Sequence, residues 1–360
     1  MRKYWQRRPL LVRSALEDFS PPIGAQALFE LARRDDVESR LVTSFDGWDL
    51  RRGPIARHRL PPIGKRGWTL LVQGVDLHDD RAAALLARFR FVADARLDDL
   101  MVSYASDGGG VGPHIDDYDV FLLQAQGQRR WRIGNGDRND VFPELPLKVL
   151  RRFEPEHEWL LGPGDLLYLP PGLAHEGTAV GGSCLTCSIG FRAPTWRELL
   201  EPWFDTTSAR PAFARRYTDP GVAPTSKPAR VPGTFIDAAL AALLQARPTR
   251  ADARAMLLTL LTEPKAGVVF ERSRRPLAAS ELRVRARRRG LRLDRRTRML
   301  YSGASLAING ELLDGAGKEL ALMFVLADQR ELTPQQTTAL GAAWWGQLGG
   351  WHAAGWLHLA

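Results

Sequence analysis

The sequence of 360 residues is short of two features that would decide its class at once: it has only two cysteines and no long hydrophobic run. Two cysteines cannot build a disulfide framework, so we expect a hydrophobic core and a reducing compartment. No segment approaches the ~20 apolar residues of a membrane helix, and the basic N-terminus lacks the apolar stretch of a signal peptide. A hydrophobic content of 44% excludes a mostly disordered chain. We therefore expect a cytoplasmic protein that does not contact a membrane.

The positive charge of the chain, +9 at neutral pH, is concentrated in residues 272–298. This basic segment holds twelve arginines and two acidic residues, and the rest of the chain is close to neutral. One interpretation is a solvated helix face. The other is a docking surface for nucleic acid or a ribonucleoprotein, because such a cluster attracts polyanions.

Short apolar runs separated by glycine, proline and aspartate fill residues 1 to about 205. Closely spaced runs of this kind are typical of an antiparallel barrel or sandwich. We expect helices at 24–34 and 80–89. The expected strands lie at 68–75, 100–105, 119–124, 130–133, 165–169 and 185–191.

A helical section follows this strand-rich part. Several prolines at 217–233 indicate a linker, and apolar residues then recur at helical spacing at 235–246 and 249–262. This section is too short to build a large core alone. We therefore expect it to pack on a neighbour or to form a dimer surface at 235–262.

The last part of the chain, residues 267–360, has the predicted order helix, strands, helices, strand. Asn309 and Gly310 are a hairpin turn signal between short apolar runs. Two more helices are expected at 318–327 and 334–345, the second with Thr333 as its N-cap. This order indicates a winged-helix-like module.

The strongest chemical signal is the pair His114 and Asp116, followed 61 residues later by His175. Residues i and i+2 of a strand share a face, and a barrel can bring the end of a later strand beside them. Two histidines and one carboxylate form the facial triad of non-haem Fe(II) oxygenases, which leaves coordination positions open. The alternative is two hydrogen-bonded barrel histidines without a metal. A second such motif at 78–80 precedes a helix, where its acids serve as capping residues.

Arg129 is the candidate for binding an acidic cosubstrate. It begins the strand after the histidine–aspartate motif and shares a strand face with Trp131 and Ile133. An inward-facing guanidinium needs an anionic partner and binds a carboxylate with two hydrogen bonds. The alternative is an arginine at a strand edge that faces water. We expect Cys184 and Cys187 to pack in the barrel, because residues three apart on a strand face opposite sides.

Four runs carry a resemblance to a known family. The runs at 108–121, 127–134, 164–177 and 188–194 have the sequences GGGVGPHIDDYDVF, GQRRWRIG, GDLLYLPPGLAHEG and SIGFRAP. They resemble the bacterial JmjC-type ribosomal oxygenases, Fe(II)- and 2-oxoglutarate-dependent enzymes that hydroxylate an arginine of a large-subunit ribosomal protein. The resemblance is strong over residues 1 to about 200, and the rest matches in layout only.

The resemblance implies an α+β chain with a JmjC-type double-stranded β-helix at 1–205, a helical dimerisation section at 206–266 and a winged-helix-like domain at 267–360. It implies homodimers. By position, His114, Asp116 and His175 match the iron ligands, while Arg129 and Ser103 match residues that hold 2-oxoglutarate. Dioxygen is the second cosubstrate. Tyr118 and Ser188 are expected to contact the substrate.

The function expected is therefore hydroxylation of an arginine in a basic ribosomal protein. Three further aspartates near the motif, Asp107, Asp117 and Asp119, are expected to make the mouth acidic and favour a cationic target. The basic segment would contact ribosomal RNA or an acidic surface. Two alternatives stay open: a cupin-like metal protein without oxygenase activity, and a nucleic-acid-binding regulator that uses the basic C-terminal module.

Overall fold

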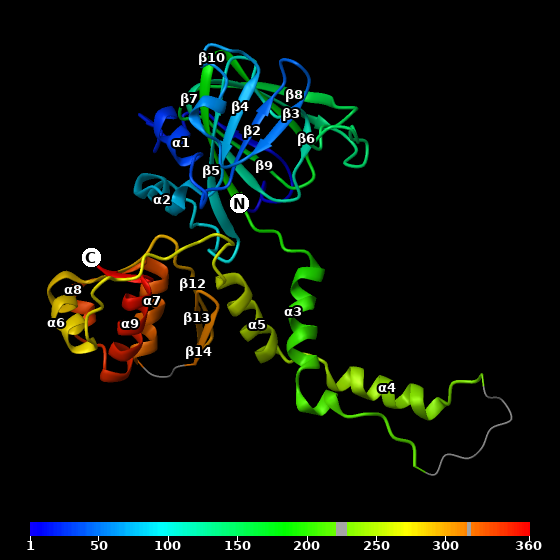
Figure 1. Cartoon of the computed structure of the whole chain (residues 1–360), viewed down its shortest axis with the longest axis vertical. Coiled ribbons are helices and arrows are strands. Elements are labelled where there is room, and N and C mark those ends of the chain that lie inside the picture. Colours follow the sequence, from blue (N-terminus) through cyan, green and yellow to red (C-terminus); the bar gives the residue numbers. More distant parts are fainter. Residues whose placement is uncertain (221–228, 315–317) are drawn as a thin grey trace.

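The computed structural model describes residues 1–220, 229–314 and 318–360, so part of the linker expected at 217–233 lies outside the described residues. Ten antiparallel strands form one curled sheet, the barrel, in the upper half of Figure 1. Their order is β1-β9-β7-β10-β5-β4-β2-β3, with β6 on β10 and β8 on β7. The strands are β1 (Leu10–Val12), β2 (Ser39–Thr43), β3 (Asp49–Arg52), β4 (Trp68–Val72), β5 (Leu97–Ala105), β6 (His114–Ile115), β7 (Val120–Asn135), β8 (Glu154–Leu161), β9 (Leu166–Leu169) and β10 (Ala174–Phe191).

The two longest strands, β7 and β10, pair along most of their length and organise the barrel. The strands expected at 119–124 and 130–133 are both parts of β7, because the chain continues through Gly127 instead of turning. Gly127 has a φ of 67°, and a Cβ there would lie 2.4 Å from the carbonyl oxygen of Ser183. Only glycine permits this close approach. On the N-terminal side of Gly127, Val120 and Leu122 face the interior of the barrel, and on its C-terminal side Trp131 faces the interior.

Apolar residues fill both sides of the curled sheet. The larger core lies between the sheet and two helices, α1 (Ala25–Leu31) and α2 (Asp80–Ala87), and includes Trp68 and Tyr104. α2 begins at the capping aspartate Asp79, which accepts a hydrogen bond from the Ala82 N–H at 2.9 Å. The acid of the motif at 78–80 therefore serves as a helix cap, as the sequence predicts.

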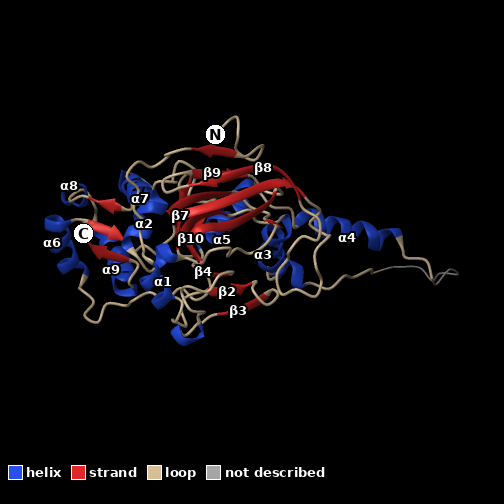
Figure 2. Cartoon of the chain, turned by 90° about the horizontal axis from the view of Figure 1, so that it is seen from above, coloured by secondary structure: helices blue, strands red, loops and turns tan. Residues whose placement is uncertain are grey.

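Three helices follow the barrel: α3 (Trp196–Ser208), α4 (Gly233–Gln245) and α5 (Arg250–Thr262). The last barrel strand ends at Phe191, and α3 crosses the expected boundary at residue 205. α4 projects away from the rest of the molecule in Figures 1 and 2, and none of its residues is buried. Within the described residues no helix is long and apolar enough to cross a membrane.

The C-terminal module contains α6 (Ala279–Arg289), β11 (Leu291–Leu293), β12 (Met299–Ser302), β13 (Ser305–Ile308), β14 (Glu311–Asp314), α7 (Lys318–Gln329), β15 (Glu331–Leu332), α8 (Pro334–Thr337), α9 (Ala342–Ala354) and β16 (Leu357–Leu359). Asn309 and Gly310 form the expected hairpin turn with φ of 47° and 86°. Thr333 caps the expected helix, but that helix ends at Thr337 and a second one starts at Ala342. The single helix expected at 334–345 was therefore wrong.

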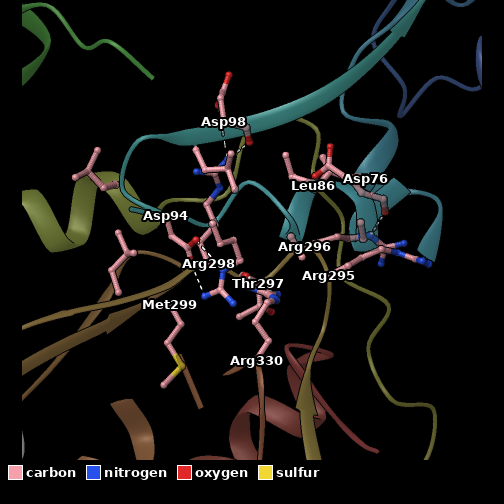
Figure 3. A pocket seen from close by; sticks show the side chains of 17 residues that line it. Asp76, Leu86, Asp94, Asp98, Arg295, Arg296, Thr297, Arg298, Met299 and Arg330 are labelled. Atoms are coloured by element: carbon pink, nitrogen blue, oxygen red, sulfur yellow. Dashed lines mark hydrogen bonds and ion pairs between the residues drawn. The ribbon is translucent and has the colours of Figure 1, made fainter. Parts of the chain in front are cut away.

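The barrel and the C-terminal module meet through three arginines of the basic segment: Arg295, Arg296 and Arg298. Arg298 donates from Nη2 to the carbonyl oxygen of Asp98 at 3.0 Å, and Arg295 pairs with Asp80 of α2. These arginines line a cleft of about 120 Å³ between the two parts. Figure 3 shows the side chains that line it. The end of the basic segment therefore holds the module on the barrel and is not free for a partner.

Candidate metal centre

Three side chains converge where β6 and β10 meet. His114 and His175 are opposite each other in the antiparallel pairing of these strands, and Asp116 directly follows β6. One ligand atom from each of the three lies within 4.8 Å of the others. The nearer Asp116 oxygen is 3.9 Å from His114 Nε2 and 3.7 Å from His175 Nε2. The H-x-D…H spacing thus gives one compact cluster.

The two imidazoles are oriented to bind a cation. In each ring Nδ1 lies 2.9 Å from a backbone carbonyl oxygen, that of Gly112 for His114 and that of Leu173 for His175. A carbonyl can only accept, so each Nδ1 carries the proton and each Nε2 keeps a lone pair that faces Asp116. Burial and the neighbouring His114 lower the pKa of His175 to about 4, which keeps it in the neutral, metal-binding form. This donor set fits the iron that the sequence implies.

Arg129 is buried beside this cluster, with an exposed fraction of only 4%. Its Nη2 donates to the carbonyl oxygen of Gly177 at 3.1 Å, and its guanidinium lies 5.0 Å from the Trp131 ring. Its Nε and Nη1 are buried without a partner, and no carboxylate of the described residues forms an ion pair with it. A buried cation with two unused donors is costly unless an anion binds there. The arginine at a strand edge facing water, the alternative interpretation, was wrong.

Two of the other predicted residues, Ser103 and Ser188, are buried on paired strands of the barrel, and the third, Tyr118, lies in the loop between β6 and β7. Ser103 is 4% exposed and lies opposite Thr186 of β10, while Ser188 lies opposite Met101 and is 8% exposed. Tyr118 is 42% exposed, next to the cluster. Burial of its phenol and the nearby Asp116 carboxylate raise the pKa of Tyr118.

Asp107, Asp117 and Asp119 do not form the acidic mouth that the sequence led us to expect. Asp119 is fully buried and accepts hydrogen bonds from Tyr168 at 2.5 Å, Gln6 at 2.9 Å and Arg96 at 3.1 Å. It therefore fixes the N-terminal segment to the barrel instead of facing a substrate. The other two expected aspartates are paired as well, Asp107 with Arg66 at 2.8 Å and Asp117 with Arg138.

Two residues near Arg129 were missed as site residues. Gly177 supplies the carbonyl that holds the guanidinium, and Trp131 has a buried indole N–H without a partner. The sequence indicated that Trp131 shares a face with Arg129, but nothing marked its N–H as unpaired. The cysteines behave as expected: Cys184 and Cys187 are both buried and free, and burial raises the pKa of Cys187 to about 12.

Comparison with known proteins points to the same family as the residues of the site do. The JmjC domain family matches residues 84–199. The ribosomal protein uL16 3-hydroxylase of Escherichia coli is 40% identical over 233 residues, which are 64% of this chain and 62% of that protein. A probable ribosomal oxygenase of Haemophilus influenzae is 36% identical over 56% of this chain and 50% of its own length. The matched region therefore spans less than two thirds of these curated relatives.

Solved structures match almost the whole chain. The crystal structure of E. coli YcfD has a TM-score of 0.90 at 30% identity and covers 99% of this chain and 96% of its own. YcfD in complex with cobalt and 2-oxoglutarate has a TM-score of 0.86 at 30% identity, with the same coverage. The expected JmjC/cupin barrel is thereby confirmed, and the 2-oxoglutarate bound in that complex is the cosubstrate expected for this chain. From its fold, its set of three His–Asp–His ligand residues and these matches, the chain belongs to the JmjC-type ribosomal oxygenases.

Proposed function

We propose that the chain is an Fe(II)- and 2-oxoglutarate-dependent oxygenase that hydroxylates an arginine side chain of a large-subunit ribosomal protein. The observation that carries this proposal is the combination of two parts in one barrel: a facial His–Asp–His cluster and a buried arginine with two unused donors. The first suits iron and the second suits the distal carboxylate of 2-oxoglutarate. Iron with 2-oxoglutarate and dioxygen supplies the oxidising power for inserting oxygen into a C–H bond.

The residues of the chain have separate tasks in this proposal. His114, Asp116 and His175 hold the iron, with their geometry set by the carbonyls of Gly112 and Leu173. Arg129 and Ser103, both buried on barrel strands, orient 2-oxoglutarate.

The proposed substrate follows from the relatives and from the motif resemblance. The E. coli relative is a hydroxylase of ribosomal protein uL16, and the H. influenzae relative is a probable ribosomal oxygenase. We assign a basic ribosomal protein as the partner, with Tyr118 and Ser188 as substrate contacts. Such a substrate places the reaction in the cytoplasm.

A homodimer is proposed from the helical section at 206–266. α4 exposes five large apolar side chains, with exposed fractions between 46% and 67%: Phe235, Ile236, Leu240, Leu243 and Leu244. An exposed apolar face of this kind marks an interaction site. We keep the domains proposed from the sequence: the JmjC barrel at 1–205, this dimerisation section and a winged-helix-like domain at 267–360.

A cupin-like metal protein without oxygenase activity would explain the His–Asp–His residues. It would not explain why two buried donors of Arg129 have no partner. A decisive experiment incubates the iron-loaded protein with 2-oxoglutarate and an arginine-bearing ribosomal peptide. We expect succinate release coupled to a gain of one oxygen in the peptide mass. Peptides with lysine or alanine in place of that arginine should remain unmodified, and equal modification of all three would refute the arginine assignment.

Two neighbouring aspartates provide a matched pair of variants. Asp116→Asn removes the carboxylate that offsets the charge of the metal and should abolish turnover. Asp117→Asn changes the next residue in the same way, but its side chain is 75% exposed and pairs with Arg138. It should keep most of the activity, and full activity of the Asp116 variant would refute the metal site.

A further inference from the structure

The basic segment 272–298 divides into two parts with different surroundings. Its end packs against the barrel through Arg295, Arg296 and Arg298, as described above. The earlier part contains α6 and the residues before it, whose arginines are exposed except for the half-buried Arg283. We call six of these the α6 arginine surface: Arg274, Arg275, Arg285, Arg287, Arg288 and Arg289.

Most of the charge on the α6 arginine surface is uncompensated. Arg285 pairs with Glu281 at 2.5 Å, and Arg289 donates from Nε to the carbonyl oxygen of Ala360 at 3.1 Å. The other four have no ion pair or hydrogen bond within the part of the chain that the structure describes. The surface therefore carries several free guanidinium groups and a single acidic neighbour.

The fold itself does not require this charge. Leu282 and Ala286, on the opposite face of α6, are fully buried and attach the helix to the module core. One or two cations in the last turn suffice to complement the helix dipole. The i,i+4 pairs Arg283–Arg287 and Arg285–Arg289 bring like charges together and cost stability. A partner that neutralises the helix would offset this cost.

The position of the helix leaves it accessible to a large partner. In Figures 1 and 2 α6 lies at the outer end of the C-terminal module, away from α4. In Figure 1 β6, which carries His114 of the metal cluster, lies on the far side of the barrel. A polyanion bound to α6 would therefore leave both the barrel mouth and the proposed dimer face free.

We propose that the α6 arginine surface binds the phosphate backbone of ribosomal RNA. Guanidinium groups bind phosphate oxygens with two hydrogen bonds, and the surface offers no asparagine or glutamine to read bases. An all-arginine surface therefore suits docking on the phosphate backbone, with guanine the one base that its side chains could also contact. The choice of RNA as the polyanion rests on the proposed function, because a ribosomal protein substrate is assembled on RNA. The surface would hold the enzyme near that substrate.

The test measures binding without any catalytic step. A fluorescein-labelled hairpin of large-subunit ribosomal RNA is titrated with the full-length protein, and anisotropy is recorded between about 50 and 200 mM salt. In Arg287→Ala/Arg288→Ala, two phosphate contacts are lost. We compare the factor by which RNA affinity falls between these two salt concentrations. This factor should be about seven- to twelvefold smaller for the variant than for the unchanged protein. The control Arg52→Ala/Arg59→Ala removes two exposed arginines of the barrel and should retain the original salt dependence.

Three results would overturn the proposal: RNA binding that is unchanged in Arg287→Ala/Arg288→Ala, competition by poly-glutamate as strong as that by RNA, or tighter binding of duplex DNA of the same sequence. The same variant should hydroxylate a short ribosomal peptide like the unchanged protein, because the peptide does not reach α6. If the unchanged protein fails to modify any peptide but still binds RNA through α6, the proposed reaction is wrong and the docking surface stands.

Discussion

Gly177 offers a way to perturb the cosubstrate site without removing any functional group. A Cβ at this position would lie 2.6 Å from Arg129 Nε and 2.7 Å from ring atoms of Trp131. Ordinary van der Waals contact begins near 3.4 Å, so Gly177→Ala requires Arg129 to move by about 0.8 Å. The Trp131 ring is buried and cannot easily retreat. Overpacking of this kind costs about 1–3 kcal/mol.

If this cost falls on cosubstrate binding, the half-saturating concentration of 2-oxoglutarate should rise about 5- to 150-fold. The assay titrates 2-oxoglutarate at fixed iron and follows succinate, with a thermal melt to check folding. Gly64→Ala is the matched control, because a Cβ there meets no atom within 4 Å. A folded Gly177→Ala protein with unchanged half-saturation would refute the role given to Arg129.

Three other predictions test separate parts of the molecule. Arg129→Lys keeps a cation but loses the planar fork, so it should raise the 2-oxoglutarate requirement without abolishing turnover; equal half-saturation in titrations of both proteins would contradict this. Asp76 is buried near Asp99, and burial raises its pKa to about 7, so the folded state retains a proton that the unfolded chain loses above pH ~4. Stability should therefore fall as pH rises from about 4 to 7. Asp76→Asn should reduce this fall and gain up to about 4 kcal/mol at pH 8, while Asp99, whose pKa burial also raises, keeps part of it. Urea titrations with the same pH slope for both proteins would contradict this prediction. Leu240→Asp/Leu243→Asp should convert a dimer to a monomer in light scattering with little change in the melting temperature; an unchanged mass would exclude α4 as the interface.

The metal cluster could be predicted from sequence because its information is local. The spacing of His114 and Asp116 alone predicts that their side chains lie together, at the end of β6, and only the return of His175 needed the barrel. The orientation of Arg129 was also predictable, since its strand neighbours Trp131 and Ile133 are apolar. Each of these inferences depends on a few adjacent residues.

Other features depend on contacts between distant segments and could not be predicted. Asp119 resembled a mouth residue until its partners Gln6, Arg96 and Tyr168 came from three other parts of the chain. The break between α8 and α9 likewise brings distant segments together: Gly341 lies so near Glu319 that a Cβ there would be 2.4 Å from a carboxylate oxygen. No periodicity within residues 334–345 reveals that neighbour.

The strand β10 has a consequence for the order in which the protein assembles. It carries His175 at its start and pairs with β5, β6 and β7, so the barrel cannot close before this strand is available. During synthesis the ribosome releases His114 and Asp116 long before the last third of the barrel. A nascent chain that ends before Ala174 therefore has two of the three ligands and nine of the ten strands, but it lacks the strand that joins β5 to β7. The complete set of three ligands therefore exists only once the start of β10 has been synthesised.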